Sequence, residues 1–167
     1  MSERVLEVEG LATEFPGPEG PVRVVDGVGF HLDRVEVLAL VGESGCGKSV
    51  TAFSLLRLIP RPGRVVAGQV RLGGREVLSL PVPEMRAVRG REAGIIFQEP
   101  LTSLNPVQPV GTQVVEAIRL HERVSAGAAR KRTVELFDRV GRPDPDARFD
   151  AHPPQLSGGM KQRVMIA

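Results

Sequence analysis

The chain has 167 residues and a mass of 18.0 kDa, which is enough for one domain with a substantial core. Apolar residues make up 41% and charged residues 25%, a balance that excludes a disordered chain, and the formal net charge of +2 gives no reason to expect nucleic acid. A single cysteine excludes an internal disulfide framework and indicates a reducing compartment; with only three histidines, it argues against structural zinc. No apolar run approaches the roughly 20 residues that cross a bilayer, and a signal-peptide pattern is missing.

The first part of the chain predicts two strands, a third strand of a different kind, and a helix. Residues 5–9 alternate between apolar and charged side chains, and 22–32 form a second strand, so we expect an antiparallel pair. The run 37–41 is apolar without alternation, which is typical of a strand covered on both faces in a parallel sheet. A glycine-rich turn follows, and 49–59 has the pattern of a helix that Pro60 stops.

The middle of the chain predicts a hairpin and short elements. Residues 65–72 and 76–80 flank Gly73-Gly74, a typical hairpin turn. One or two helical turns are expected at 84–88, and another short buried strand at 94–97.

The last part predicts helices at 110–121, 126–140 and 158–167, separated by a proline-rich connection at 142–155. Ser125 suits the N-cap of the second of these helices and Gly141 its C′ position.

Arginine is concentrated between Arg57 and Arg91, a segment with eight arginines and only two acidic residues, Glu76 and Glu84. One interpretation is a solvated surface on which arginine stems cover apolar neighbours. The other is a surface for an anionic partner or a lipid headgroup layer.

The segment from Gly42 to Ser49 reads G-E-S-G-C-G-K-S and matches the phosphate-loop pattern G-x-x-x-x-G-K-[ST] at every fixed position. Its glycines let the backbone turn tightly and bring amide groups onto phosphate oxygens, and the following helix points its N-terminus at the same anion. Lys48 supplies a point charge to the β- and γ-phosphates, and Ser49 offers a hydroxyl to Mg²⁺. Cys46 holds a variable position, as a small packing residue or as a redox-sensitive thiol.

A second motif, L-S-G-G-M-K-Q-R, runs from Leu156 to Arg163 and places two glycines after a serine at the start of a helix. Gln98 lies 50 residues after Lys48 at the end of a short apolar strand, and Ser157 lies 59 residues after Gln98. Phosphate loop, strand-end glutamine and L-S-G-G-x-x-Q-R, in that order, resemble the ATP-binding-cassette (ABC) ATPases.

Within that family the chain resembles the nucleotide-binding subunits of the dipeptide, oligopeptide and nickel importers. The motifs V-G-E-S-G from Val41, F-Q-E-P-L-T-S-L-N-P from Phe97 and S-G-G-M-K-Q-R-V-M-I-A from Ser157 carry this likeness, whereas H-P-P-Q from His152 departs from it. The resemblance implies an α/β fold: a P-loop NTPase of the ABC type with an N-terminal antiparallel β subdomain (1–36 and 60–80), a P-loop core (37–59 and 90–99) and a helical subdomain (100–167).

The resemblance also implies the roles of the site residues, with ATP and Mg²⁺ as ligands. Gln98 is the catalytic Q-loop residue and a Mg²⁺ contact together with Ser49, and Phe15 stacks on adenine unless it serves only the core. Ser157 to Gly159 would close on the nucleotide of a facing subunit. The implied nucleotide contacts are Phe15, Gly42, Glu43, Ser44, Gly45, Cys46, Gly47, Lys48, Ser49, Val50, Ser157, Gly158, Gly159 and Gln162.

The implied partners are a second ABC ATPase subunit, identical or different, and two integral membrane permease subunits, which the helical region 100–140 would face. The chain would lie on the cytoplasmic face of the inner membrane and would bind neither nucleic acid nor the solute directly.

The sequence departs from the family in two ways. The 167 residues do not reach the Walker B strand with its Asp and the general-base Glu, so we expect a truncated domain that hydrolyses ATP poorly alone and exposes the apolar run 37–41. Glu99 is expected to be a solvated loop charge and no substitute. Val35 replaces a usual turn glycine, so the turn there is expected to differ.

Three other interpretations remain open. The chain is a nonhydrolysing remnant that a partner completes, or an ABC ATPase that acts outside transport on nucleic acid or ribosomes. A small-molecule kinase is the most distant of them, because it leaves Leu156 to Arg163 without a role.

Overall fold

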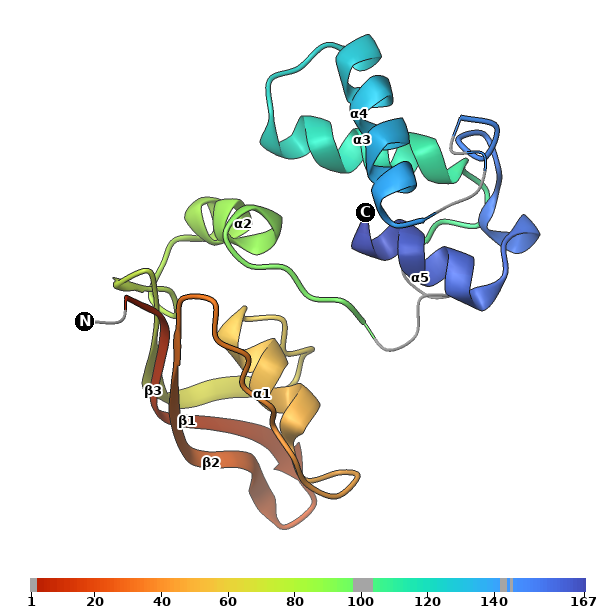
Figure 1. Cartoon of the computed structure of the whole chain (residues 1–167). Coiled ribbons are helices and arrows are strands. Elements are labelled where there is room, and N and C mark those ends of the chain that lie inside the picture. Colours follow the sequence, from red (N-terminus) through yellow and green to blue (C-terminus); the bar gives the residue numbers. More distant parts are fainter. Residues whose placement is uncertain (1–2, 98–103, 142–143, 145) are drawn as a thin grey trace. The chain divides into compact units, whose positions relative to one another are not determined.

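The computed structural model describes residues 3–97, 104–141, 144 and 146–167. The chain forms two compact units, Met1–Arg89 and Gly90–Ala167, and each is described by itself (Figure 1). No helix among the described residues is long and apolar enough to cross a membrane.

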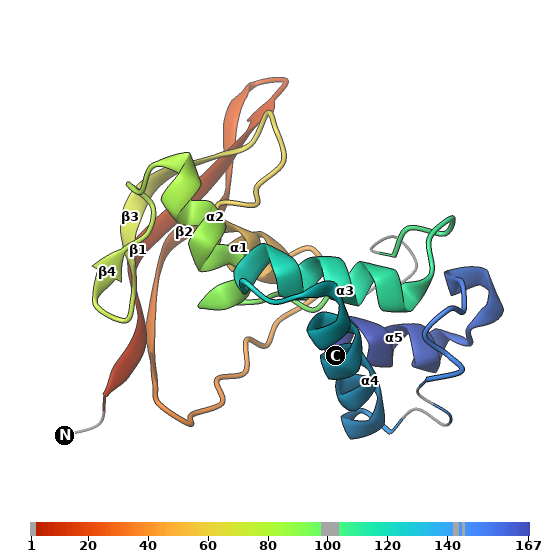
Figure 2. The same cartoon turned by 90° about the horizontal axis from the view of Figure 1, so that it is seen from above.

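The first unit is built on an antiparallel sheet with the strand order β2-β1-β3-β4 (Figure 2). Its strands are β1 (Arg4–Gly17), β2 (Gly20–Asp33), β3 (Arg64–Leu72) and β4 (Arg75–Glu76). The predicted antiparallel pair is confirmed, and both of its strands are longer than the alternating patterns indicated. The predicted hairpin is also confirmed, although its second strand has two residues where five were expected at 76–80.

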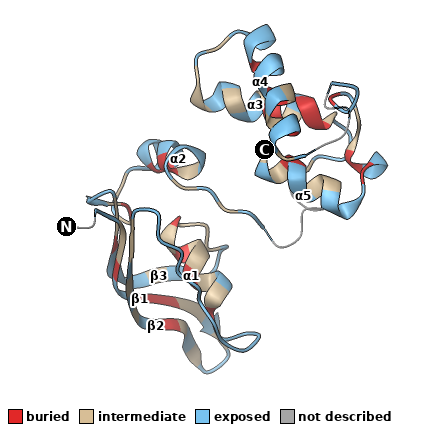
Figure 3. Cartoon of the chain, in the orientation of Figure 1, coloured by how far each residue is buried: buried red, intermediate tan, exposed pale blue. Residues whose placement is uncertain are grey.

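Two helices accompany the sheet, α1 (Lys48–Leu55) and α2 (Val82–Arg91); all of α2 except its last two residues belongs to this unit. Helix α1 packs against β1 and β2. The buried residues of the unit lie on β1, β2, β3, both helices and the connections between them (Figure 3). Inside this core the hydroxyl groups of Thr13 and Ser54 form a hydrogen bond of 2.7 Å, which ties β1 to α1. Helix α1 ends before Pro60, because Arg57 adopts a φ of +52° and turns the chain away.

The predicted buried strands at 37–41 and 94–97 are wrong: neither segment is a strand. Val37 and Val41 are 93% and 91% exposed, and Ile96 is 58% exposed. An apolar run becomes a buried strand only where neighbouring strands pair with its backbone, and the described sheet is made of other residues.

The turn that follows β2 has a positive φ at Val35, although the β-branched side chain of valine argued against one. Val35 has a φ of +65° and is 96% exposed. The amide of Glu36 donates to the carbonyl oxygen of Asp33 at 3.1 Å, so Val35 holds the third position of a four-residue turn. The expectation of a different turn is therefore wrong, because the turn's hydrogen bond holds Val35 in a conformation that β-branched residues avoid.

The second unit is helical and contains α3 (Val110–His121), α4 (Ala126–Arg139), the short 3₁₀ helix η2 (Pro153–Gln155) and α5 (Gly158–Ile166). These bounds agree closely with the predicted helices, and η2 lies in the predicted proline-rich connection. The caps predicted for α4 are confirmed: the Ser125 side chain accepts a hydrogen bond from the amide of Ala128, and Gly141 has a φ of +69°.

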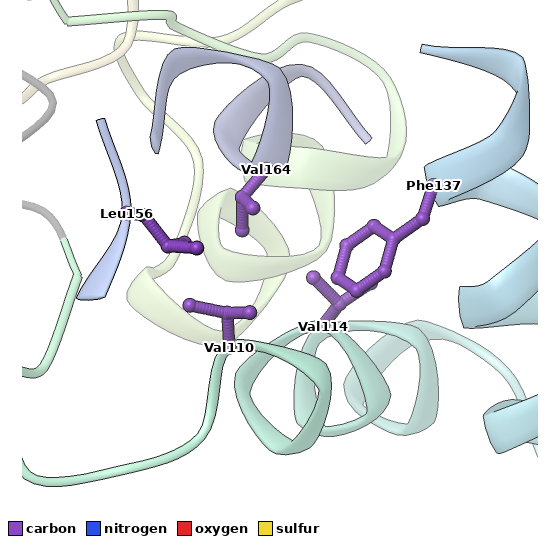
Figure 4. Packing of buried hydrophobic residues seen from close by; sticks show 5 residues of the cluster. All are labelled: Val110, Val114, Phe137, Leu156 and Val164. Atoms are coloured by element: carbon purple, nitrogen blue, oxygen red, sulfur yellow. The ribbon is translucent and has the colours of Figure 1, made fainter. Parts of the chain in front are cut away.

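One hydrophobic cluster joins three of these helices (Figure 4). Val110 and Val114 come from α3, Phe137 from α4, and Val164 from α5, with Leu156 just before α5. Phe137 is fully buried, and Figure 4 shows its ring beside Val114 at one side of the cluster. Through Leu156 and Val164 this cluster holds α5, and therefore sets the direction in which the start of α5 points within the second unit.

Candidate functional site

The loop before α1 has the geometry of an anion-binding turn. Gly47 is the N-cap of α1 with a φ of +92°, and no side chain caps the first amides of the helix. Gly47 is buried, and a Cβ built on it would lie 2.6 Å from the carbonyl oxygen of Val24. Only glycine fits this position, and the uncapped amides with the positive end of the helix dipole favour an anion there.

Lys48 is held on the loop itself. Its Nζ donates hydrogen bonds to the carbonyl oxygens of Gly42 at 2.7 Å and Glu43 at 2.6 Å. The Sγ of Cys46 lies 3.4 Å from the same nitrogen. The ammonium group is thus brought to the loop whose backbone turns around it, and a phosphate oxygen is a stronger acceptor for it than a neutral carbonyl.

The other loop residues give the site an open side. Glu43, Ser44 and Ser49 are exposed, and Val50 is half-buried. The Ser49 hydroxyl, on the second residue of α1, is therefore accessible to a metal ion beside the phosphates. Among the described residues, no group of three His, Cys, Asp or Glu side chains could hold a metal ion.

Phe15 lies on β1 at the rim of a hollow of about 330 Å³ that Pro21, Pro62 and Arg64 also line. A Cβ on Gly63 would lie 2.4 Å from the Phe15 ring, so the ring also packs on the backbone of that glycine. Phe15 is half-buried. This arrangement leaves both predicted roles open, because one side of the ring serves packing while the residue lines an open hollow.

The second motif begins a helix in the second unit. Ser157 is the N-cap of α5, and its hydroxyl accepts a hydrogen bond from the amide of Met160 at 3.3 Å. Gly158 and Gly159 form the first turn, and a Cβ on either would meet nothing within 4 Å. Gln162 is exposed on the next turn. The serine and both glycines therefore present an open helix end, while Leu156 and Val164 anchor α5 in the core.

Two predicted residues, Gln98 and Glu99, lie outside the described residues. The remaining site residues fall into both units: those up to Val50 lie in the first and those from Ser157 onward in the second.

Sequence reasoning missed the residues that hold the phosphate-loop helix. The Thr51 hydroxyl donates to the carbonyl oxygen of Gly47 at 3.0 Å, which fastens the first turn of α1. At the other end of α1, the guanidinium group of Arg89 donates to the carbonyl oxygens of Leu56 and Arg57. The concentration of arginine between Arg57 and Arg91 was the only signal of this contact in the sequence.

Comparison with known proteins assigns the family. The sequence profile of the family described as ABC transporter matches residues 25–167. The chain belongs to the ABC transporter family. This ABC chain is 49% identical to the oligopeptide transport ATP-binding protein OppD of Bacillus subtilis (strain 168) over 165 residues, which cover 98% of the chain and 46% of that protein. It is 43% identical to the dipeptide transport ATP-binding protein DppD of Escherichia coli (strain K12) over 163 residues, which cover 98% of the chain and 50% of that protein.

The ABC chain thus spans about half the length of these curated relatives. Among solved structures it is similar to the ATP-binding cassette MJ0796 in a dimeric post-hydrolysis state bound to ADP and Pi, with a TM-score of 0.84. The likeness covers 96% of the chain and 67% of that cassette at 23% identity, so it confirms the predicted α/β ABC fold.

Proposed function

We propose that this chain is part of the ATP-binding subunit of an ABC importer for dipeptides or oligopeptides. The observation that carries the proposal is the loop from Gly42 to Ser49, with an uncapped helix N-terminus and the Lys48 ammonium group held against its backbone. The relatives named for oligopeptide and dipeptide transport support the class of solute, which favours peptides over nickel.

The loop residues would act on the triphosphate in complementary ways. The backbone amides of the loop and of the first turn of α1 would donate to the phosphate oxygens, and Lys48 would exchange its two carbonyl partners for the β- and γ-phosphates. Mg²⁺, when bound, neutralises phosphate charge, and the Ser49 hydroxyl would hold it. Phe15 would stack on the adenine, and Gln98 would be the catalytic contact to the metal and the attacking water.

The open end of α5 would act on a second subunit. Ser157, Gly158 and Gly159 present uncrowded backbone and a hydroxyl, which suits close approach to a phosphate bound by a facing ABC subunit. The dimeric state named for the similar cassette supports this arrangement. Two integral membrane permease subunits would complete the transporter, with this subunit on the cytoplasmic face of the membrane and its residues 100–167 forming the helical subdomain.

We further propose that the 167 residues alone hydrolyse ATP slowly. The phosphate loop supplies binding and charge, but among the described residues no acidic cluster accompanies it. A missing water-activating carboxylate lowers the rate by roughly 10²–10⁴. Steady-state hydrolysis by the purified chain at 1 s⁻¹ or faster, a typical enzymatic rate, would contradict this part of the proposal.

Nucleotide binding is tested with two lysine substitutions. Lys48→Ala removes a charged contact to phosphate, and we expect ATP affinity to fall by about tenfold or more. Lys131→Ala removes the same charge from an exposed position on α4 and should leave the affinity unchanged. Titration with a fluorescent ATP analogue in the presence of Mg²⁺ measures both. Equal affinities for the two variants would show that the loop does not hold the triphosphate.

A further inference from the structure

One arginine of α2, Arg89, forms hydrogen bonds with the C-terminal end of α1, the helix that follows the phosphate loop. The Nε of Arg89 donates to the carbonyl oxygen of Leu56 at 2.8 Å, and its Nη2 donates to that of Arg57 at 2.7 Å. These two carbonyls directly follow α1, at the negative end of its dipole. A planar guanidinium group makes both bonds at once, whereas a lysine ammonium is a single point charge.

The site around Arg89 is built and partly desolvated. Burial lowers the pKa of Arg89 most, and the nearby charges of Arg57 and Arg86 lower it further. Arg89 nevertheless remains protonated at neutral pH, because arginine stays charged in proteins. The Arg57 side chain turns away to donate to the carbonyl oxygen of Leu80 at 2.5 Å, so both arginines bind backbone in this region. A charge that is partly buried near two like charges is unfavourable. This cost indicates that the contact of Arg89 with the end of α1 has a specific role.

Because α1 is short, the contact at its C-terminal end also affects the phosphate loop at its N-terminal end. The helix has eight residues and is therefore about 12 Å long, too short to bend between its ends. The last turn of α1 is tied to β1 by the buried hydrogen bond between Ser54 and Thr13. Arg89 adds a second point of attachment directly after this one. A helix that is released from Arg89 and held at Ser54 alone can pivot there, and the pivot moves Lys48 and Ser49 at the opposite end.

We propose that Arg89 is a positioning residue for nucleotide binding: by fixing the C-terminal end of α1, it sets the direction of the amides, the ammonium group and the hydroxyl at the phosphate loop. The inference rests on the proposed function, since it assigns to Arg89 the orientation of that same site. It also gives a role to one member of the arginine-rich segment that the phosphate chemistry does not use.

Three variants of the purified protein test the inference. Arg89→Ala removes both hydrogen bonds, and Arg89→Lys keeps a charge but cannot bridge the two carbonyls. Arg86→Ala is the matched control, because Arg86 is exposed on the same helix and, in the part of the chain described, its side chain makes no hydrogen bond or ion pair. The readouts are the Kd for a fluorescent ATP analogue with Mg²⁺, the hydrogen exchange of amides 48–51, and the melting temperature.

We expect Arg89→Ala to raise the Kd by about tenfold, less than the roughly hundredfold loss that follows a displacement of about 1 Å at a reacting centre. Amides 48–51 should exchange faster in Arg89→Ala, and Arg89→Lys should recover only part of the affinity. If Arg89→Ala does not fold, Arg89→Lys takes its place in the comparison. Arg86→Ala should stay within about twofold of the unmodified protein, well under the tenfold effect that 1.4 kcal/mol produces.

The inference is overturned if Arg89→Ala or Arg89→Lys lowers the melting temperature but matches Arg86→Ala in Kd and in the exchange of amides 48–51. Arg89 would then be a helix cap and nothing more. Failure of the proposed function has a different signature, namely no difference in nucleotide affinity between Lys48→Ala and the unmodified protein. In that case faster exchange of amides 48–51 in the Arg89 variants would show only that Arg89 orders the loop, and its role in nucleotide binding would be overturned together with the proposed function.

Discussion

Val35 is strained in the turn after β2, and replacing it with glycine should stabilise the protein. Its φ of +65° places a β-branched side chain in the left-handed region, at a cost of about 1–2 kcal/mol. The side chain is 96% exposed, so the substitution removes almost no buried surface. The turn hydrogen bond from the amide of Glu36 to the carbonyl oxygen of Asp33 involves backbone only and is retained.

Glycine also gains freedom in the unfolded chain, which offsets about 0.5–1 kcal/mol of the relieved strain. The net expectation for Val35→Gly is an increase of about 0.5–1 kcal/mol in the free energy of unfolding, or about 1–4 °C in melting temperature. Val35→Asn should gain part of this, because asparagine tolerates the left-handed region. Far-ultraviolet circular dichroism is the suitable probe, since the chain has no tryptophan or tyrosine.

Val37→Gly is the matched control. Val37 is 93% exposed and is not among the described non-glycine residues with positive φ, so glycine there brings only the entropic penalty. We expect this control to lose about 0.5–1 kcal/mol in the free energy of unfolding. If Val35→Gly loses stability to the same degree as Val37→Gly, the strain argument is refuted.

Two further predictions concern packing and buried polarity. Gly111→Ala should destabilise the second unit by about 1–3 kcal/mol, because its Cβ would lie 2.4 Å from a phenylalanine ring. Gly127→Ala places its methyl group in open space on α4 and should stabilise the unit by up to about 1 kcal/mol. Equal melting temperatures for the two variants would contradict this prediction. Ser54→Ala should lower the free energy of unfolding by about 1–3 kcal/mol by leaving the buried Thr13 hydroxyl unpaired, and adding Thr13→Val should recover part of the loss in urea unfolding. Strictly additive losses in the double variant would argue against that hydrogen bond.

The sequence alone determined the elements whose signals are local. The helices of the second unit, the Ser125 cap and the hairpin at Gly73-Gly74 depend on residues within a few positions of one another, so their patterns predicted them. The order and spacing of the motifs also identified the family that the comparisons confirmed. The chemistry of the loop from Gly42 to Ser49 was readable because fixed residue types create its shape.

Tertiary structure decided the features that depend on distant partners. The run 37–41 carries the composition of a buried strand, but a strand needs neighbours that its own residues cannot supply, and the described sheet is formed by other segments. The turn at Val35 kept a positive φ because hydrogen bonds around it outweigh the local preference of valine. Arg89 reaches carbonyls 32 and 33 residues earlier in the chain. No local pattern encodes such a contact, because only folding brings the end of α1 against α2.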